Sequence, residues 1–131
     1  MNAEAVDFVY YTVTDIEDAV SFYRDTLGLT AEMVDEDMGW AEFAVPPTTL
    51  ALGEDSEGMP TDPGSGGAAV ALAVEDVEAA VDELREAGST VGMEPFDSGV
   101  CDMAMVEDPD GNAIMLHHRH DGTTGRRDPL P

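Results

Sequence analysis

Three side chains that can carry chemistry fall on predicted strands: Glu42, Cys101 and His117. An imidazole titrates near neutral pH, a carboxylate can act as acid, base or metal ligand, and a thiolate is a nucleophile or soft ligand. Together they could form a displaced metal site or a general acid–base pair. Each also has a simpler interpretation, because a histidine near a strand end is often just half-exposed, and a cysteine without a basic neighbour in sequence suits a structural role.

The hairpin that positions His117 is encoded by its turn, Asp-Pro-Asp-Gly-Asn at residues 108–112. Pro109 restricts φ, Gly111 tolerates positive φ, as Asn112 also can, and Asp108 can accept hydrogen bonds from the amides of the turn. The flanking segments alternate side chains between two faces, which predicts an antiparallel pair. On this alternation His117 shares a face with Cys101. His118 faces the opposite way, where it can pair with Asp102, and His120 is assigned to the tail.

The order strand, helix and three strands occurs twice. Asp15 and Asp76 are predicted N-caps, and Gly28 and Gly88 stand where a left-handed residue ends each helix. Matching residues at constant spacing along the chain indicate a duplication. The inward helix positions are Ile16, Ala19, Val20, Tyr23 and Leu27, then Val77, Ala80, Val81, Leu84 and Ala87. The predicted strands are residues 6–13, 30–35, 40–45, 48–53, 68–74, 91–96, 100–107 and 113–118.

We therefore predict an α+β fold with two βαβββ modules, residues 1–53 and 68–118, which form a curved mixed sheet around a cleft. Residues 54–67 are rich in Gly, Pro, Ser and acidic residues without apolar periodicity, which indicates a linker loop. Residues 119–131 carry most of the arginines and are predicted to be a flexible tail. The alternative is an arm that lies over the acidic body or across a dimer partner.

Two motifs resemble the vicinal oxygen chelate superfamily, which includes glyoxalase I, extradiol dioxygenases and bleomycin-resistance proteins. VTDIEDAVSFYRDTLG at residues 13–28 looks like the first strand–helix unit of the family, and AMVEDPDGNAIML at residues 104–116 looks like its closing hairpin. Metal-dependent members hold a divalent ion through His and Glu residues of the first and last strands of each module. The corresponding positions in this chain are Phe8, Ala51, Ala69 and Met115, so the family ligands are missing.

The resemblance therefore implies the metal-free bleomycin-resistance type, which holds a small molecule in its cleft. We expect no cofactor, and a divalent metal only at a nonstandard site. Strand alternation predicts an apolar, sulfur-rich lining in which aromatic rings offer flat contact area and methionines adapt to irregular shapes. The simpler interpretation is that these side chains pack the module interface. The predicted ligand-binding residues are Phe8, Tyr10, Thr12, Trp40, Glu42, Ala51, Ala69, Ala71, Met103, Met105, Met115 and His117.

Our leading hypothesis is a protein that binds a small apolar or aromatic molecule between its modules. One alternative is an enzyme, a glyoxalase-like lyase or isomerase or a dioxygenase, with a nonstandard site of Glu42, Cys101 and His117. The other is a structural or regulatory protein with a filled cleft. We expect a homodimer, because the resemblance implies one and open sheet faces need covering.

Charge is the strongest compositional signal, since 29 acidic residues stand against five arginines and no lysine, a formal net charge of −24. Phosphate binding needs clustered cations, so nucleic acid is excluded as a partner. No segment reads as a membrane span or secretory signal, and a single cysteine agrees with a reducing compartment, so a cytoplasmic location is expected. Acidic residues along every element indicate adaptation to a salty cytoplasm.

We expect the protein to be folded in molar salt and to unfold when desalted. At about 1 M salt the Debye length is roughly 3 Å, so neighbouring carboxylates are screened, whereas at low salt they repel one another. Circular dichroism across a salt series measures this. A spectrum that is the same in molar salt and in plain buffer would contradict salt adaptation.

Overall fold

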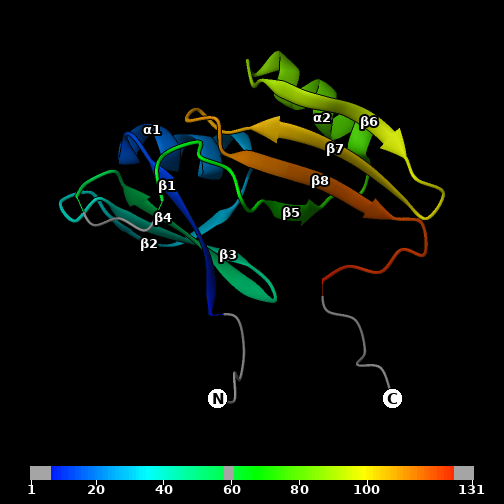
Figure 1. The fold of residues 1–131 in the computed structure, drawn as a ribbon. Coiled ribbons are helices and arrows are strands. Elements are labelled where there is room, and N and C mark those ends of the chain that lie inside the picture. The colour runs from blue at the N-terminus through cyan, green and yellow to red at the C-terminus, as the bar shows by residue number, and fades with distance from the viewer. Residues whose placement is uncertain (1–6, 58–60, 126–131) are drawn as a thin grey trace. The chain divides into compact units, whose positions relative to one another are not determined.

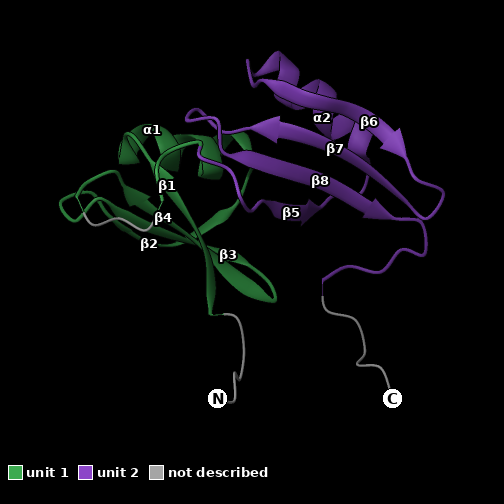
Figure 2. Ribbon diagram, in the orientation of Figure 1, with its two compact units in different colours: residues 1–64 green, residues 65–131 purple. Residues whose placement is uncertain are grey.

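The computed structural model describes residues 7–57 and 61–125. The chain divides into two compact units, residues 1–64 and residues 65–131 (Figures 1 and 2). Each unit has its own four-stranded mixed sheet and one strand–helix–three-strand order, so the predicted α+β fold of two βαβββ modules is confirmed. The division falls inside the segment 54–67 that we predicted as the linker.

Unit 1 pairs its first and last strands in parallel at one side of the sheet. The strand order is β1-β4-β3-β2, with antiparallel pairs between β4 and β3 and between β3 and β2. The elements are β1 (Phe8–Val13), α1 (Ile16–Ser21), a π-helix η1 (Phe22–Thr26), β2 (Thr30–Asp35), β3 (Trp40–Val45) and β4 (Thr48–Glu54).

The helix of unit 1 begins as predicted but ends differently. Asp15 is the N-cap, and its Oδ1 accepts a hydrogen bond from the Asp18 amide at 3.1 Å. From Phe22 onward the chain forms a π-helix, in which the Leu27 amide donates to the Phe22 carbonyl at 2.9 Å. Phe22 and Tyr23 are both buried and meet edge to face at 5.2 Å. We predicted a single regular helix over this segment. The structure instead has a short α-helix followed by a π-helix, in which the consecutive residues Phe22 and Tyr23 are both buried.

Unit 2 repeats this arrangement with the strand order β5-β8-β7-β6, in which β5 and β8 are parallel. Asp76 is the N-cap of its helix, and its Oδ1 accepts from the Ala79 amide at 3.0 Å. Ala87, predicted to point inward, is the exposed C-cap residue. The elements are β5 (Val70–Ala73), α2 (Val77–Glu86), β6 (Val91–Asp97), β7 (Cys101–Glu107) and β8 (Ala113–Arg119).

The turn between β7 and β8 is organised by Asp108, whose residue exposure is 4%. Its Oδ1 accepts from the amides of Asp110 and Asn112 at 2.9 and 2.8 Å, and its Oδ2 accepts from the Asn112 side chain at 2.8 Å. Gly111 has φ of 85°, whereas no residue other than glycine has positive φ in the described part of the chain. The predicted hairpin and the predicted role of Asp108 are therefore confirmed.

Each sheet buries one face against its own helix. In unit 1, α1 packs on β3 and β4, and in unit 2, α2 packs on β6, β7 and β8. The opposite face of each sheet carries the side chains that we predicted to line the cleft, which alternation places away from the helices. The buried side chains of the unit 1 core include Val13, Tyr23, Phe43, Leu50 and Leu52, and those of unit 2 include Val81, Leu84, Ala104, Val106, Ile114 and Leu116.

The ends of several strands differ from the prediction. Strand β5 covers residues 70–73 instead of 68–74. Val70 lies opposite Ile114, which is close to the start of β8, so residues before Val70 have almost no strand to pair with. Strand β8 continues to Arg119, which pairs with Cys101, and the His120 amide donates to the Val100 carbonyl at 3.0 Å. The start of the predicted tail is thus attached to the sheet. Residues 126–131 of that tail, Val6 of the first predicted strand and residues 58–60 of the predicted linker lie outside the described residues.

Among the described residues, no helix is long and apolar enough to span a membrane.

We expect Asp76→Ala to lower the free energy of unfolding by about 1 kcal/mol, because the Ala79 amide loses its capping partner. Asp76→Asn is the matched control, since asparagine removes the charge and keeps a capping oxygen. Urea denaturation in molar salt measures both variants. Equal loss of stability in the two variants would show that charge, and not capping, explains the effect of Asp76.

Candidate functional site

An aromatic cluster covers the helix-free face of the unit 1 sheet. The Tyr10 and Trp40 rings stack with their centroids 5.6 Å apart and their planes at 20°, and Phe8 meets Trp40 edge to face at 6.4 Å. Phe8 and Tyr10 belong to β1 and Trp40 to β3, so the rings reach across β4, which lies between these strands. Three of the predicted ligand-binding residues therefore form one continuous surface.

The strand beneath the rings is what allows them to meet. Tyr10 lies opposite Ala51 on β4, and Trp40 lies opposite Gly53. Neither residue has a side chain larger than a methyl group, so the rings from β1 and β3 can pack over β4. Ala51 is completely buried. Ala51 therefore shapes the predicted binding face from below and offers no exposed contact.

Polar groups border the aromatic cluster. The Trp40 indole Nε1 donates to Glu42 Oε2 at 3.1 Å, which holds the carboxylate beside the ring. Thr12 Oγ1 donates to the Tyr10 hydroxyl oxygen at 3.0 Å and lies 2.8 Å from Thr61 Oγ1. Thr12 is 1% exposed, so it positions Tyr10 and is not itself a contact surface. Glu42 is half-buried and follows Trp40 by two residues on the same face of β3, while Asp35 on β2 lies opposite Trp40.

The corresponding face of unit 2 is lined by methionines. Met115 pairs with Ala71 on one side and Met105 on the other, and His117 pairs with Ala73 and Met103. These methionines and His117 are half-buried, and the two alanines are exposed. Ala69, also predicted here, is exposed but precedes β5. The strand pairing therefore places the other predicted unit 2 residues on one face.

Sequence reasoning missed two residues of this face, Met93 and Phe96 on β6. They lie opposite Met105 and Met103, and Phe96, which is 56% exposed, also lines the pocket at the start of α2. Regular alternation would put an odd-numbered and an even-numbered residue on opposite faces, but irregularities in register on both sides of Met93 interrupt it. Gly92 and Pro95, which lie on either side of Met93, were the available signal for an irregular strand.

His117 and Cys101 line one pocket of about 520 Å³ at the end of β8. The other lining residues are Gly99, Val100, Arg119, His120 and Asp121. Cys101 is 8% exposed, and its Sγ lies 3.1 Å from Ser98 Oγ. Burial and this polar contact favour the structural interpretation of the thiol. Glu42 belongs to unit 1, so its membership of a site with Cys101 and His117 stays a prediction.

The family positions for a divalent metal do not fit one in this chain. Phe8 supplies a phenyl ring, Ala51 and Ala69 supply methyl groups, and Met115 supplies a thioether, which is a ligand for soft ions only. In the parallel pair β5–β8, Met115 lies opposite Ala71, so the two family positions of unit 2, Ala69 and Met115, are not direct neighbours. We assign no metal-dependent step to these positions.

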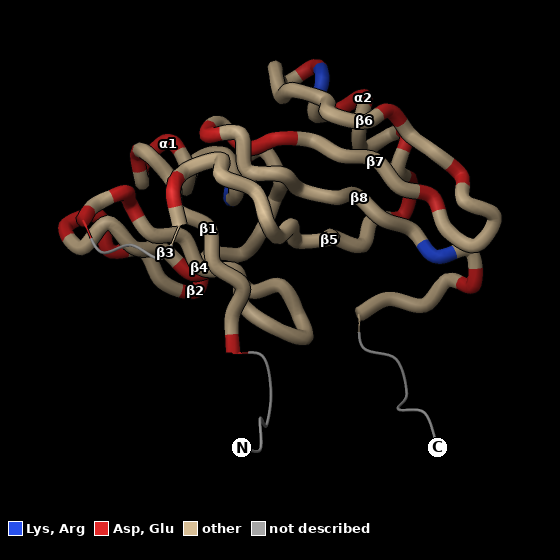
Figure 3. The backbone as a smooth tube through the Cα atoms, viewed as in Figure 1, with Lys and Arg blue, Asp and Glu red and all other residues tan. Residues whose placement is uncertain are grey.

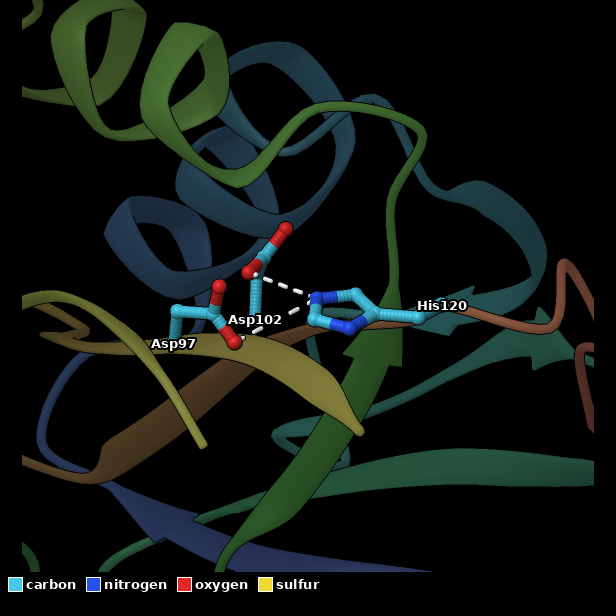
Figure 4. Close-up of side chains that lie close together, drawn as sticks. All are labelled: Asp97, Asp102 and His120. Carbon is cyan, nitrogen blue, oxygen red and sulfur yellow. Dashed lines mark hydrogen bonds and ion pairs between the residues drawn. The ribbon is translucent and has the colours of Figure 1, made fainter. Parts of the chain in front are cut away.

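A second pocket, of about 460 Å³, opens at the N-terminus of α2. Here the predicted pairing of His118 with Asp102 is wrong. His118 Nδ1 instead lies 3.0 Å from the Val74 carbonyl oxygen, while Asp102 Oδ1 lies 2.9 Å from Nε2 of His120 (Figure 4). The lining residues are Glu75, Asp76, Val77, Glu78, Pro95, Phe96, Asp97, Asp102 and His118.

Asp97 joins this interaction, with its Oδ1 3.6 Å from the same nitrogen of His120. The hydrogen bond to Asp102 raises the pKa of His120 above its usual value, partial burial opposes the shift, and the charges of Asp102 and Asp97 add to the increase. His120 was predicted to be part of the tail, yet it is bound to the β6–β7 hairpin.

In each unit the first strand lies at the edge of the sheet and pairs in parallel with the last strand, and one helix covers a face. The fold therefore consists of two copies of one βαβββ module. The family model described as the Glyoxalase/Bleomycin resistance protein/Dioxygenase superfamily matches residues 5–116. The chain belongs to this superfamily.

The relatives of this chain whose names state a function are of two kinds. A "Probable lactoylglutathione lyase" of Synechocystis sp. is 32% identical over 117 residues, which cover 79% of this chain and 87% of that protein. The crystal structure of TnmS3, an antibiotic binding protein from Streptomyces sp. CB03234, is 31% identical, with a TM-score of 0.73 and coverage of 91% of this chain and 98% of that one. A glyoxalase-related enzyme from Fulvimarina pelagi, 18% identical with a TM-score of 0.76 and coverage of 95% and 100%, shows the fold alone.

We expect the Cys101 thiol to react with a thiol reagent at least about tenfold more slowly in the folded protein than in the denatured chain, because exposure of Sγ requires local opening. The chain has a single cysteine, so the labelling is unambiguous. Equally fast labelling in both states would favour the alternative in which Cys101 is a nucleophile.

Proposed function

We propose that this chain binds a small apolar or aromatic molecule and is a metal-free member of the bleomycin-resistance type. The observation that carries the proposal is the cluster of Phe8, Tyr10 and Trp40 on the helix-free face of the unit 1 sheet. Phe8 is 48% exposed, a large fraction for an aromatic side chain that already contacts another ring. A planar ligand that covers this surface gains both burial of apolar area and aromatic contact.

The polar groups around the cluster support a ligand with one hydrogen-bonding or cationic group. Glu42 Oε2 already accepts from Trp40 Nε1, and a carboxylate can accept further hydrogen bonds through both oxygens. Such a group orients a ligand whose remaining surface is apolar. The proposed anchor therefore combines a flat aromatic surface with one carboxylate at its border.

The methionine-rich face of unit 2 is the second surface that we assign to ligand binding. Met103, Met105 and Met115 are flexible and polarisable, so they can contact ligands of irregular shape. The cleft between the modules and the homodimer predicted from the sequence remain part of this proposal. A filled, non-binding cleft is the outcome against which ligand binding has to be tested.

The named relatives support the proposal to different degrees. TnmS3 is an antibiotic binding protein, which agrees with a binding function for the fold. The curated relatives named as probable lactoylglutathione lyases suggest an enzyme instead. The pocket that His117 and Cys101 share is the observation that favours this second candidate. We rank it lower, because side chains at the four family metal positions offer no nitrogen or oxygen ligand.

Adaptation to high salt is part of the proposed function. Acidic residues lie on strands, helices and loops of both units, with few arginines between them (Figure 3). Some are close enough to interact, because the charge of Glu36 is the main cause that raises the pKa of Glu17. A raised carboxyl pKa means that the folded state binds protons more tightly, so this contact disfavours folding as pH rises through that pKa. Salt weakens the same repulsion.

The fluorescence of Trp40, the single tryptophan of the chain, provides a direct test. We expect saturable quenching by members of a panel of neutral and cationic polycyclic aromatic compounds in molar salt. Tyr10→Ala should weaken the affinity about fivefold or more, because loss of one aromatic contact costs about 1 kcal/mol or more. Calorimetry of Trp40→Ala, with the compounds that quench, measures the contribution of the indole.

Tyr11→Phe is the matched control, because Tyr11 is 6% exposed and alternates to the opposite side of β1. The Tyr11→Phe variant should bind the quenching compounds with the same affinity as the unchanged chain. No saturable quenching by any compound would favour the filled cleft. Quenching that persists unchanged in Tyr10→Ala would place the ligand away from the aromatic cluster.

A further inference from the structure

Three side chains of types that can bind a metal ion come from separate segments and converge beside the β6–β7 hairpin (Figure 4). Asp97 ends β6, Asp102 is near the start of β7, and His120 directly follows β8. Each residue offers one ligand atom, and these atoms all lie within 4.8 Å of one another. We call this set the Asp97–Asp102–His120 cluster.

The distances inside the cluster are close to those between ligands of one bound ion. Nε2 of His120 lies 2.9 Å from Asp102 Oδ1 and 3.6 Å from Asp97 Oδ1. Nitrogen and oxygen ligands about 2.1 Å from one divalent ion lie roughly 3.0 to 3.4 Å apart in octahedral or tetrahedral geometry. Only small side-chain movements are needed for the three atoms to share an ion.

The backbone holds the ligand residues close together whether or not an ion is bound. Asp97 and Asp102 are opposite residues of the antiparallel pair β6–β7, and the His120 amide donates to the Val100 carbonyl in the loop between these strands. Two carboxylates directly opposite each other in a sheet repel, so the pair needs positive charge nearby. Protonated His120 supplies it in part, and a divalent ion would supply more.

The surroundings of the cluster also favour a cation. Asp97 and Asp102 line the pocket at the start of α2 together with Glu75, Asp76 and Glu78. Carboxylates that share a concave surface produce a strongly negative potential, which attracts a divalent ion more than a monovalent one.

We propose that the Asp97–Asp102–His120 cluster binds one first-row divalent transition-metal ion, with Zn²⁺ or Mn²⁺ preferred to Mg²⁺ because of the imidazole ligand. The ion connects the end of β8 to the β6–β7 hairpin and offsets the repulsion between the two aspartates. This site is separate from the family metal positions. Asp102 lies opposite His118 in the β7–β8 register and lines the pocket at the start of α2 with it, whereas alternation puts Met115 on the other side of the sheet. It does not depend on the proposed ligand binding.

Calorimetry of the full chain with Zn²⁺, after treatment with a chelator and in molar salt, tests the stoichiometry and the ligands. We expect one site per chain. Asp97→Asn, Asp102→Asn and His120→Ala should each weaken Zn²⁺ binding at least about tenfold, because asparagine replaces an anionic oxygen ligand by a neutral amide and alanine removes the imidazole. Asp97 has a side-chain exposure of 67%, so its substitution leaves the fold intact even if His120→Ala does not.

Asp37→Asn is the matched control, because it removes the same charge from an exposed turn of unit 1. Its Zn²⁺ affinity should be unchanged. Mn²⁺ should broaden the amide resonances of residues 97–102 and 119–121 selectively in NMR spectra. Equal Zn²⁺ binding in Asp97→Asn and Asp37→Asn, many weak sites per chain, or broadening centred elsewhere would overturn the proposal and indicate general attraction of cations to an acidic surface.

Discussion

Each four-stranded sheet has one helix of its own to cover it, and the rest of the structure depends on this. Alternation along a strand puts Leu50 and Leu52 against α1 in unit 1 and sends Ala51 to the other side. The covered face forms the core, and the helix-free face keeps apolar side chains that are only partly buried. Ligand binding, packing between modules and association of chains are all ways to cover such a face. The proposed function follows from this incomplete burial more than from any single reactive residue.

The fold could be predicted where local physical chemistry determines it. Asp15 and Asp76 are caps because a carboxylate satisfies amides that a helix leaves unpaired, and Asp108 organises its turn for a similar reason. Local pattern does not specify where the hydrogen-bonding ladder slips or a helix widens. The π-helix after Ser21 was not predicted for this reason, and the register slips around Met93 were missed although Gly92 and Pro95 indicate an irregular strand.

The candidate site shows the same division. Alternation was enough to place Tyr10 and Trp40 on one face, but it could not reveal that their rings stack. We predicted that Asp102 pairs with His118 because alternation places both residues on the same face, and the structure does put them opposite each other across β7 and β8. The actual partner of Asp102, His120, comes after the last predicted strand, where the β7–β8 ladder continues further than the sequence pattern indicated. Contacts of this kind depend on three segments at once, which a linear pattern does not contain.

Strand β4 has a role that its small side chains conceal. Ala51 and Gly53 set the height at which the aromatic rings lie above the backbone, although Ala51 is itself completely buried. A larger side chain at either position would lift or separate the rings and so change the depth and outline of the surface. Ligand preference in such a protein can therefore diverge through residues that no ligand touches, while every aromatic residue stays the same.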